Sequence, residues 1–105
     1  MTENIISLQH VKEIIEQGDF DKLEMAVLNL YKIANDIASK SQGGRLTSET
    51  YSQALDVDEI LRHVSHVAVL AAIEDERYAK IYNSCQNALG LLGSAFNRES
   101  NFNRL

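Results

Sequence analysis

The sequence predicts an all-α protein, an antiparallel bundle of four helices, and three observations support that prediction. Apolar residues recur at alternating steps of three and four, the period of helices with one buried face. The 105 residues include no proline, which sheet proteins and loop-rich folds use in their turns. Hydrophobic residues make up 45% of the chain, an ordinary share for a folded protein. We expect a single domain over residues 1–105.

The first two expected helices are separated by a glycine. Apolar residues fall at helical spacing from about residue 7 to 17, and Gly18 stands where a left-handed C-terminal cap belongs. Asp19 is the expected N-cap of the second helix. That helix carries one regular apolar stripe, formed by Phe20, Leu23, Val27, Leu30, Ala34 and Ile37. A pair of glycines ends it, and we expect a loop near residues 41–47.

The second half of the chain predicts two more helices and leaves one boundary open. Residues 48–55 either form a short helix of their own, which would make five, or lead into a helix that begins at Asp56. An acidic break at residues 74–76 precedes the last helix. Its apolar seam is the most regular in the chain and consists of Tyr78, Tyr82, Cys85, Leu89, Leu92 and Phe96. From residue 97 to 105 we expect a flexible polar tail.

Charge and cysteine content narrow the classes of function. Fifteen acidic and ten basic side chains give a net charge of −5, whereas nucleic-acid binding normally requires a basic face. The single cysteine cannot form an internal disulfide, and the N-terminus lacks the pattern of a secretory signal, so we expect a cytoplasmic protein. The longest apolar run, residues 67–73, is too short to cross a bilayer. We therefore expect neither a membrane nor nucleic acid as a partner.

One group of side chains has the spacing of metal ligands. Glu59, His63 and His66 are four and three residues apart, which places them on one side of the third long helix. Zinc accepts imidazole and carboxylate ligands, but a stable site needs three or four of them and a supporting second layer of contacts. The interpretation we favour is a polar helix surface in which Glu59 pairs with His63. We expect no cofactor.

Surplus apolar residues indicate a surface that binds another molecule. Residues 67–73 are apolar on every side, although a helix of a small bundle normally keeps one polar face. Either this helix is the centre of the bundle, or a second protein or a second copy covers it. Met25, Leu28 and Ile33 lie off the main stripe of their helix, which indicates contact with more than one neighbour. The residues expected to contact a partner are Val69, Leu70, Ile73, Leu91 and Arg45.

Together these features predict a non-catalytic interaction protein, a regulator, inhibitor or adaptor that binds a protein partner and forms a homodimer. We do not expect an enzyme, because the sequence shows no catalytic constellation and Cys85 lies on an apolar seam where a small hydrophobic residue belongs. An immunity or antitoxin-type protein is one alternative, since bacteriocin immunity proteins are helical bundles of similar length. A metal-binding bundle or a small DNA-binding regulator is another, although the possible helix-turn-helix over residues 48–73 offers few cations besides Arg62.

Overall fold

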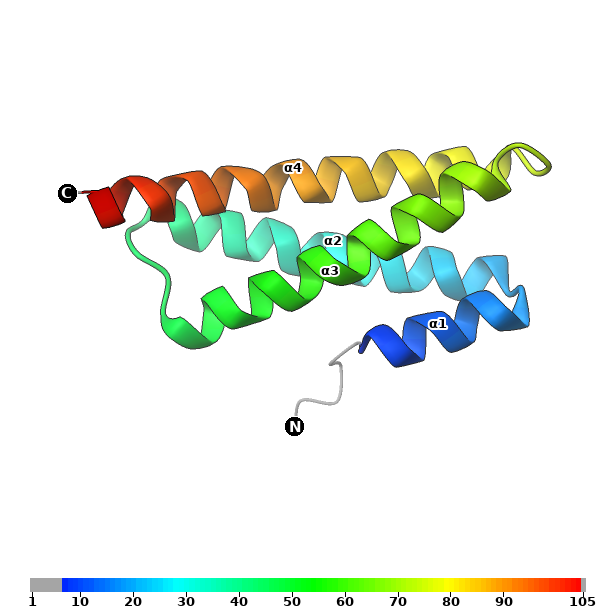
Figure 1. Cartoon of the computed structure of the whole chain (residues 1–105), viewed down its shortest axis with the longest axis horizontal. Helices are drawn as coiled ribbons and strands as arrows, with labels where there is room; N and C mark the ends of the chain where they lie inside the picture. The colour runs from blue at the N-terminus through cyan, green and yellow to red at the C-terminus, as the bar shows by residue number, and fades with distance from the viewer. Residues whose placement is uncertain (1–6, 105) are drawn as a thin grey trace.

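A computed structural model describes residues 7–104 of the chain, with side chains from residue 7 to residue 101, and shows four helices (Figure 1). The helices are α1 (Leu8–Gln17), α2 (Phe20–Gln42), α3 (Ser48–Ala71) and α4 (Arg77–Arg104). The described residues form no strand, so the all-α prediction is confirmed. None of the helices among these residues combines the length and the apolar character that a bilayer span requires.

Side-chain and glycine caps set the boundaries of α1 and α2 where the sequence predicts them. Ser7 Oγ accepts a hydrogen bond from the backbone N–H of His10 at 3.1 Å. Gly18 adopts a left-handed conformation with φ of 69°, and its N–H donates to the carbonyl of Ile15 at 3.0 Å. Asp19 Oδ1 then accepts from the N–H of Lys22 at 3.1 Å. The chain therefore reverses between α1 and α2 within two residues.

The third helix is continuous, so the bundle has four helices and not five. Thr47 is the N-cap, and its Oγ1 accepts from the N–H of Thr50 at 3.1 Å. The alternative helix start at Asp56 is wrong, because Asp56 lies inside α3. The physical reason is packing: Ala54 and Val57, on either side of Asp56, are both buried in the core, which holds one helical register through this region.

The fourth helix is longer than the sequence predicts. The expected polar tail is wrong for residues 97–104, which continue α4 to Arg104, while residue 105 lies outside the described residues. Two polar residues of this segment, Arg98 and Glu99, hydrogen-bond to distant parts of the chain, which stabilises the helix here. Glu99 is only 8% exposed, and it accepts a hydrogen bond from the backbone of Leu46 in the loop between α2 and α3.

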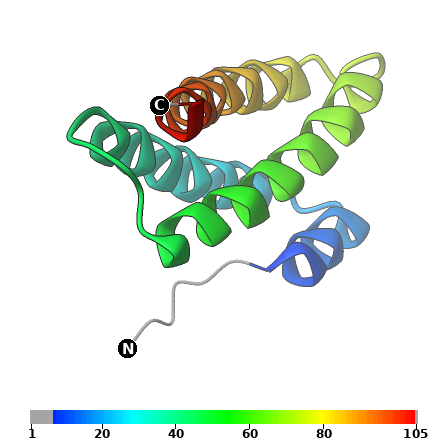
Figure 2. The ribbon, with the colours of Figure 1, turned by 60° about the vertical axis from the view of Figure 1, so that its left-hand side comes forward.

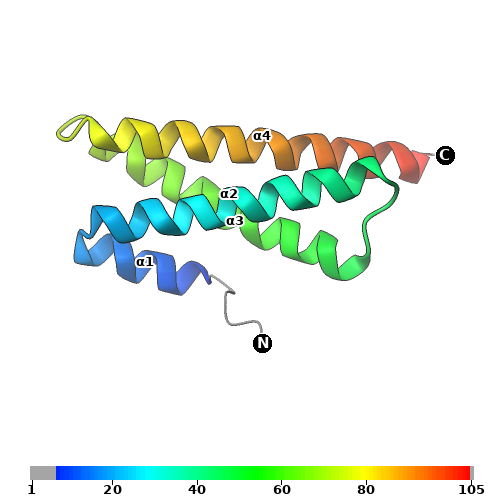
Figure 3. The same cartoon turned by 180° about the vertical axis from the view of Figure 1, so that it is seen from behind.

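The four helices form a flat bundle that measures 48 × 31 × 16 Å along its principal axes. Consecutive helices are antiparallel, as predicted, so α2 and α4 run in the same direction (Figures 1 and 3). Both α2 and α3 pack extensively along α4, whereas α2 and α3 contact each other less. Figure 2 shows that α2 and α3 diverge toward the loop that joins them. The short α1 packs against α2 and α3 at the other end.

The core lies mainly between α2, α3 and α4, with Val11 and Ile14 added by α1, and it confirms the predicted apolar faces. Every member of the α2 stripe from Leu23 to Ile37 is at most 2% exposed. Along α4 the buried line is displaced by about one residue from the predicted seam, because the aromatic residues lie at its margin. The fully or nearly buried residues of α4 are Ile81, Cys85, Ala88, Leu92 and Ala95. Tyr78 instead meets Phe20 edge to face, with ring centroids 5.1 Å apart.

Candidate functional site

Three apolar side chains at the C-terminal end of α3 are exposed, and we call this surface the α3 tip. Val69 is 43% exposed, Leu70 is 55% exposed and Ile73 is 80% exposed. Ile73 lies two residues after Ala71, the last residue of α3, and its N–H donates to the carbonyl of Leu70 at 3.3 Å. Ile73 is four residues after Val69 and three after Leu70, the spacings that bring side chains to one side of a helix, so the three form one surface. They are three of the five residues predicted to contact a partner.

The opposite side of the same segment faces the core, which resolves why the sequence is apolar all round. Ala68 is fully buried. Val67 and Ala71 are half-buried and line a small cavity of about 140 Å³ together with Leu23 from α2 and Tyr78 from α4. Helix α3 is therefore not enclosed by its own bundle at this end. Its inner face is covered, and its outer face meets solvent.

Charged side chains border the α3 tip in the turn that leads to α4. Glu74 and Glu76 are exposed there. Between them, Asp75 binds the Arg77 guanidinium, with 2.8 Å between Oδ2 and Nη2, and this contact lowers the pKa of the Asp75 carboxyl below its ordinary value. The same guanidinium carbon lies 4.4 Å from the centroid of the Phe20 ring. The Asp75–Arg77 pair thus attaches the turn to the start of α2.

The other two predicted contact residues lie elsewhere. Leu91 is half-buried in α4 and packs against the core, so it contributes little free surface. Arg45 is exposed in the loop between α2 and α3, and its Nε lies 3.9 Å from Oε1 of Glu99. That loop and the α3 tip are at opposite ends of the long axis (Figure 1). The structure therefore brings together three of the five residues.

The residues with the spacing of metal ligands do not assemble into a site. Glu59 and His66 are exposed and His63 is half-buried, all on α3. Within the part of the chain that the structure describes, no three His, Cys, Asp or Glu side chains are grouped as metal ligands would be. Their spacing places the three side chains on one side of α3, but a closed coordination shell also requires ligands from a neighbouring element. The nearby Arg62 instead pairs with Asp58 at 2.8 Å, which raises the pKa of Arg62.

Cys85 is a core residue, as its position on the apolar seam predicts. The side chain is fully buried in α4, and burial raises the pKa of the thiol to about 12. The thiol is therefore neutral at physiological pH, and a neutral thiol is a poor nucleophile.

A polar cluster that the sequence did not reveal joins α4 to the end of α2 and to the loop that follows. Ser41 is 2% exposed, and its hydroxyl donates to the carbonyl of Ala38 at 2.7 Å and accepts from Nη1 of Arg98 at 2.6 Å. Glu99 Oε2 accepts from the N–H of Leu46 at 2.7 Å. The contacts of Arg98 with Ser41 and of Glu99 with Leu46 join residues more than fifty positions apart, so no local pattern in the sequence predicts them. The hydrogen bond from Leu46 to Glu99 fixes the position of the loop on α4.

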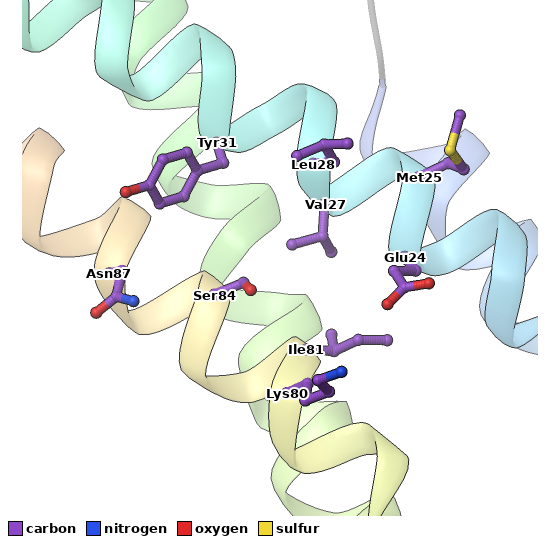
Figure 4. A pocket seen from close by; sticks show the side chains of 9 residues that line it. All are labelled: Glu24, Met25, Val27, Leu28, Tyr31, Lys80, Ile81, Ser84 and Asn87. Atoms are coloured by element: carbon purple, nitrogen blue, oxygen red, sulfur yellow. The ribbon is translucent and has the colours of Figure 1, made fainter.

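A groove between α2 and α4 is the second surface feature of note (Figure 4). Its volume is about 510 Å³, within the range of binding sites in proteins. Met25 and Leu28 stand at its α2 edge and are 61% and 48% exposed. The sequence placed both residues off the main stripe and indicated a further neighbour for them. In the single chain both remain largely exposed.

Neither models of protein families, nor curated proteins, nor solved structures match this chain. The assignment of function therefore depends on the surfaces described above. Two of them expose apolar side chains on ordered helices, the α3 tip and the groove between α2 and α4. In other proteins, large exposed apolar patches are often sites of contact with another molecule.

Proposed function

We propose that this protein is a non-catalytic interaction protein that binds a protein partner through the α3 tip. The observation that supports this proposal is the exposure of Leu70 and Ile73, at 55% and 80%, on a helix whose other face is packed. Full burial of one such side chain contributes roughly 1.5–3 kcal/mol. A partner that covers the α3 tip therefore gains several such contributions. They offset the entropic cost of association.

The surroundings of the α3 tip fit a preorganised contact. The Asp75–Arg77 pair and the contact of Arg77 with Phe20 hold the turn beside the tip. A turn that is already ordered loses less conformational entropy when a partner binds. Because Glu74 and Glu76 are exposed next to the apolar residues, the partner surface that fits is an apolar pocket bordered by basic side chains.

A regulator, inhibitor or adaptor of this kind acts by occupying a surface of its partner. Its effect depends on contact area and complementarity, and it requires no reactive group of its own. The buried and neutral thiol of Cys85 is consistent with this mode of action, because it serves as packing in the core.

Affinity capture with matched variants tests the proposal. The wild-type protein, the double variant Leu70→Asp with Ile73→Asp, and the control Leu55→Asp would be immobilised and exposed to lysate of the native host. Leu55 is 50% exposed on the same helix but near its other end, so it matches Leu70 in burial and chemistry. Circular dichroism would verify that all three proteins are equally helical.

We expect one partner, quantified by mass spectrometry, to bind the wild-type and Leu55→Asp proteins and to be lost from the double variant. A partner that binds all three proteins equally would contradict the assignment of the α3 tip. Failure of the wild-type protein to retain any protein above the bare resin would contradict the proposed function itself.

A further inference from the structure

The groove between α2 and α4 has two walls that match each other in spacing and direction. Glu24, Leu28 and Tyr31 lie on the α2 wall, at steps of four and three residues. On the α4 wall stand Lys80, Ser84 and Asn87, at the same steps. Because α2 and α4 run in the same direction, both series ascend the groove together. Figure 4 shows Glu24 and Lys80 toward one end of the groove and Tyr31 and Asn87 toward the other.

The residues at matching positions are chemically complementary. The first pair, Glu24 and Lys80, carries opposite charges on exposed side chains. The third pair, Tyr31 and Asn87, combines a phenol hydroxyl with an amide, which can form a hydrogen bond. In the middle pair a large apolar side chain, Leu28, stands across from the small Ser84.

We propose that two copies of this chain form a symmetric dimer in which the α2–α4 groove of one copy faces the α2–α4 groove of the other. A two-fold axis along the groove places each α2 wall against the α4 wall of the second copy. Glu24 of each copy then meets Lys80 of the other, so the ion pair occurs twice, as a symmetric interface requires. The α2 and α4 helices of both copies then form two stacked pairs, as in a four-helix bundle, and Met25 and Leu28 become part of the shared core between them.

Charge favours a second copy at this surface. The chain carries a net charge of −5, so two copies repel each other in general. The two charged residues of this groove, Glu24 and Lys80, are balanced in sign, and the two-fold arrangement brings unlike charges together. A partner of uniform charge would gain an attraction at one wall and meet a repulsion at the other.

The available area is sufficient for a stable dimer. Helix α2 has 23 residues and α4 has 28, so at a rise of about 1.5 Å per residue they share a length of roughly 35 Å. Two packed helices whose axes are 8–10 Å apart form a strip roughly 20 Å wide, which gives about 700 Å². Specific, stable interfaces bury about 600–1,000 Å² on each partner, so the area of this strip lies within that range.

Charge reversal tests the pairing directly. Sedimentation equilibrium of the full chain at low ionic strength would give the dimer dissociation constant for Glu24→Lys, for Lys80→Glu, for the double variant and for wild type. Each single variant replaces two attractions with two repulsions, so we expect its dimer dissociation constant to rise at least about tenfold. The double variant restores both ion pairs, and its affinity should return to within about threefold of wild type. Glu59→Lys, on the outer side of α3, makes the same change of charge and should leave the affinity unchanged.

Disulfide trapping provides a second measurement that does not depend on charge. A mixture of the separate variants Leu28→Cys and Ser84→Cys should form a disulfide-linked dimer under mild oxidation, because each chain carries only one of the two new cysteines and the pair can meet only across the interface. Cys85 should not compete, since it is fully buried. Circular dichroism would verify the fold of each variant.

The outcomes separate this dimer from the binding of a partner through the α3 tip. We expect a dimer dissociation constant of about 1 µM. A wild-type chain that is still monomeric at about 100 µM, roughly 100 times that constant, would overturn the proposal. So would a double variant that remains as weak as the single variants. Loss of self-association in Leu70→Asp with Ile73→Asp, but not in Glu24→Lys, would instead locate the dimer at the α3 tip.

Discussion

Replacement of Glu99 by alanine should destabilise the protein far more than its position near the end of α4 suggests. The Glu99 carboxylate is 8% exposed and accepts the backbone N–H of Leu46 at 2.7 Å. A hydrogen bond to a charged group contributes about 1.5–3 kcal/mol, and its loss leaves the Leu46 N–H without this acceptor. The contact with Arg45 adds little, because its atoms are 3.9 Å apart and the Arg45 side chain is 59% exposed.

We therefore expect Glu99→Ala to lower the free energy of unfolding by about 2 kcal/mol. For a domain of this size, 1 kcal/mol corresponds to a change of about 4–8 °C in Tm, so Tm should fall by roughly 8–16 °C. Urea denaturation followed by circular dichroism at 222 nm measures the free energy of unfolding, and a thermal scan measures Tm. Glu99→Gln keeps an acceptor oxygen and should cost less than Glu99→Ala.

Asp36 provides a matched control for this measurement. It also pairs with a basic side chain, Lys40, at 3.2 Å, but both side chains are more than half exposed. Asp36→Ala should change the free energy of unfolding by less than about 0.5 kcal/mol. If Glu99→Ala were as mild as Asp36→Ala, the contact between the loop and α4 would not stabilise the fold, and the reasoning would be refuted.

Three further predictions concern the caps and the core. Gly18→Ala should cost about 1 kcal/mol by urea denaturation, because φ of 69° disfavours any side chain; an unchanged midpoint would contradict this cap. Leu30→Ala should cost about 2–5 kcal/mol, since Leu30 is 1% exposed, whereas Met25→Ala should have little effect on the monomer. Cys85 should resist a thiol reagent at pH 8 until the protein unfolds. Burial raises its pKa from 9.0 to about 12, so the associated stability is intact below pH 9 and declines as pH rises toward 12.

Local patterns were sufficient to predict the helices and much of the core. The cap at Gly18 and the buried α2 stripe depend only on neighbours within a few residues, and the structure confirms both. The start of α3 could not be decided from local patterns, because it depends on packing against distant segments. Asp56 resembles an N-cap, but packing of Ala54 and Val57 against the core outweighs that local preference.

The candidate binding surfaces were predicted less completely. The sequence singled out Val69, Leu70 and Ile73, and the structure shows that they are exposed together. It could not show that Leu91 packs against the core, because half-buried and exposed positions have the same spacing on an amphipathic helix. Nor could it reveal the groove between α2 and α4, since α2 and α4 are not consecutive in the chain.

The sequence by itself determined that this chain is helical, where α1 and α2 begin and end, and which residues avoid water. Those properties depend on short-range backbone bonds and on the periodicity of apolar side chains. Only the tertiary structure decided that α2 and α4 lie side by side, that Glu99 holds the loop, and that the α3 tip faces solvent. The physical reason is that these contacts join distant segments, whose meeting depends on how all four helices share one core.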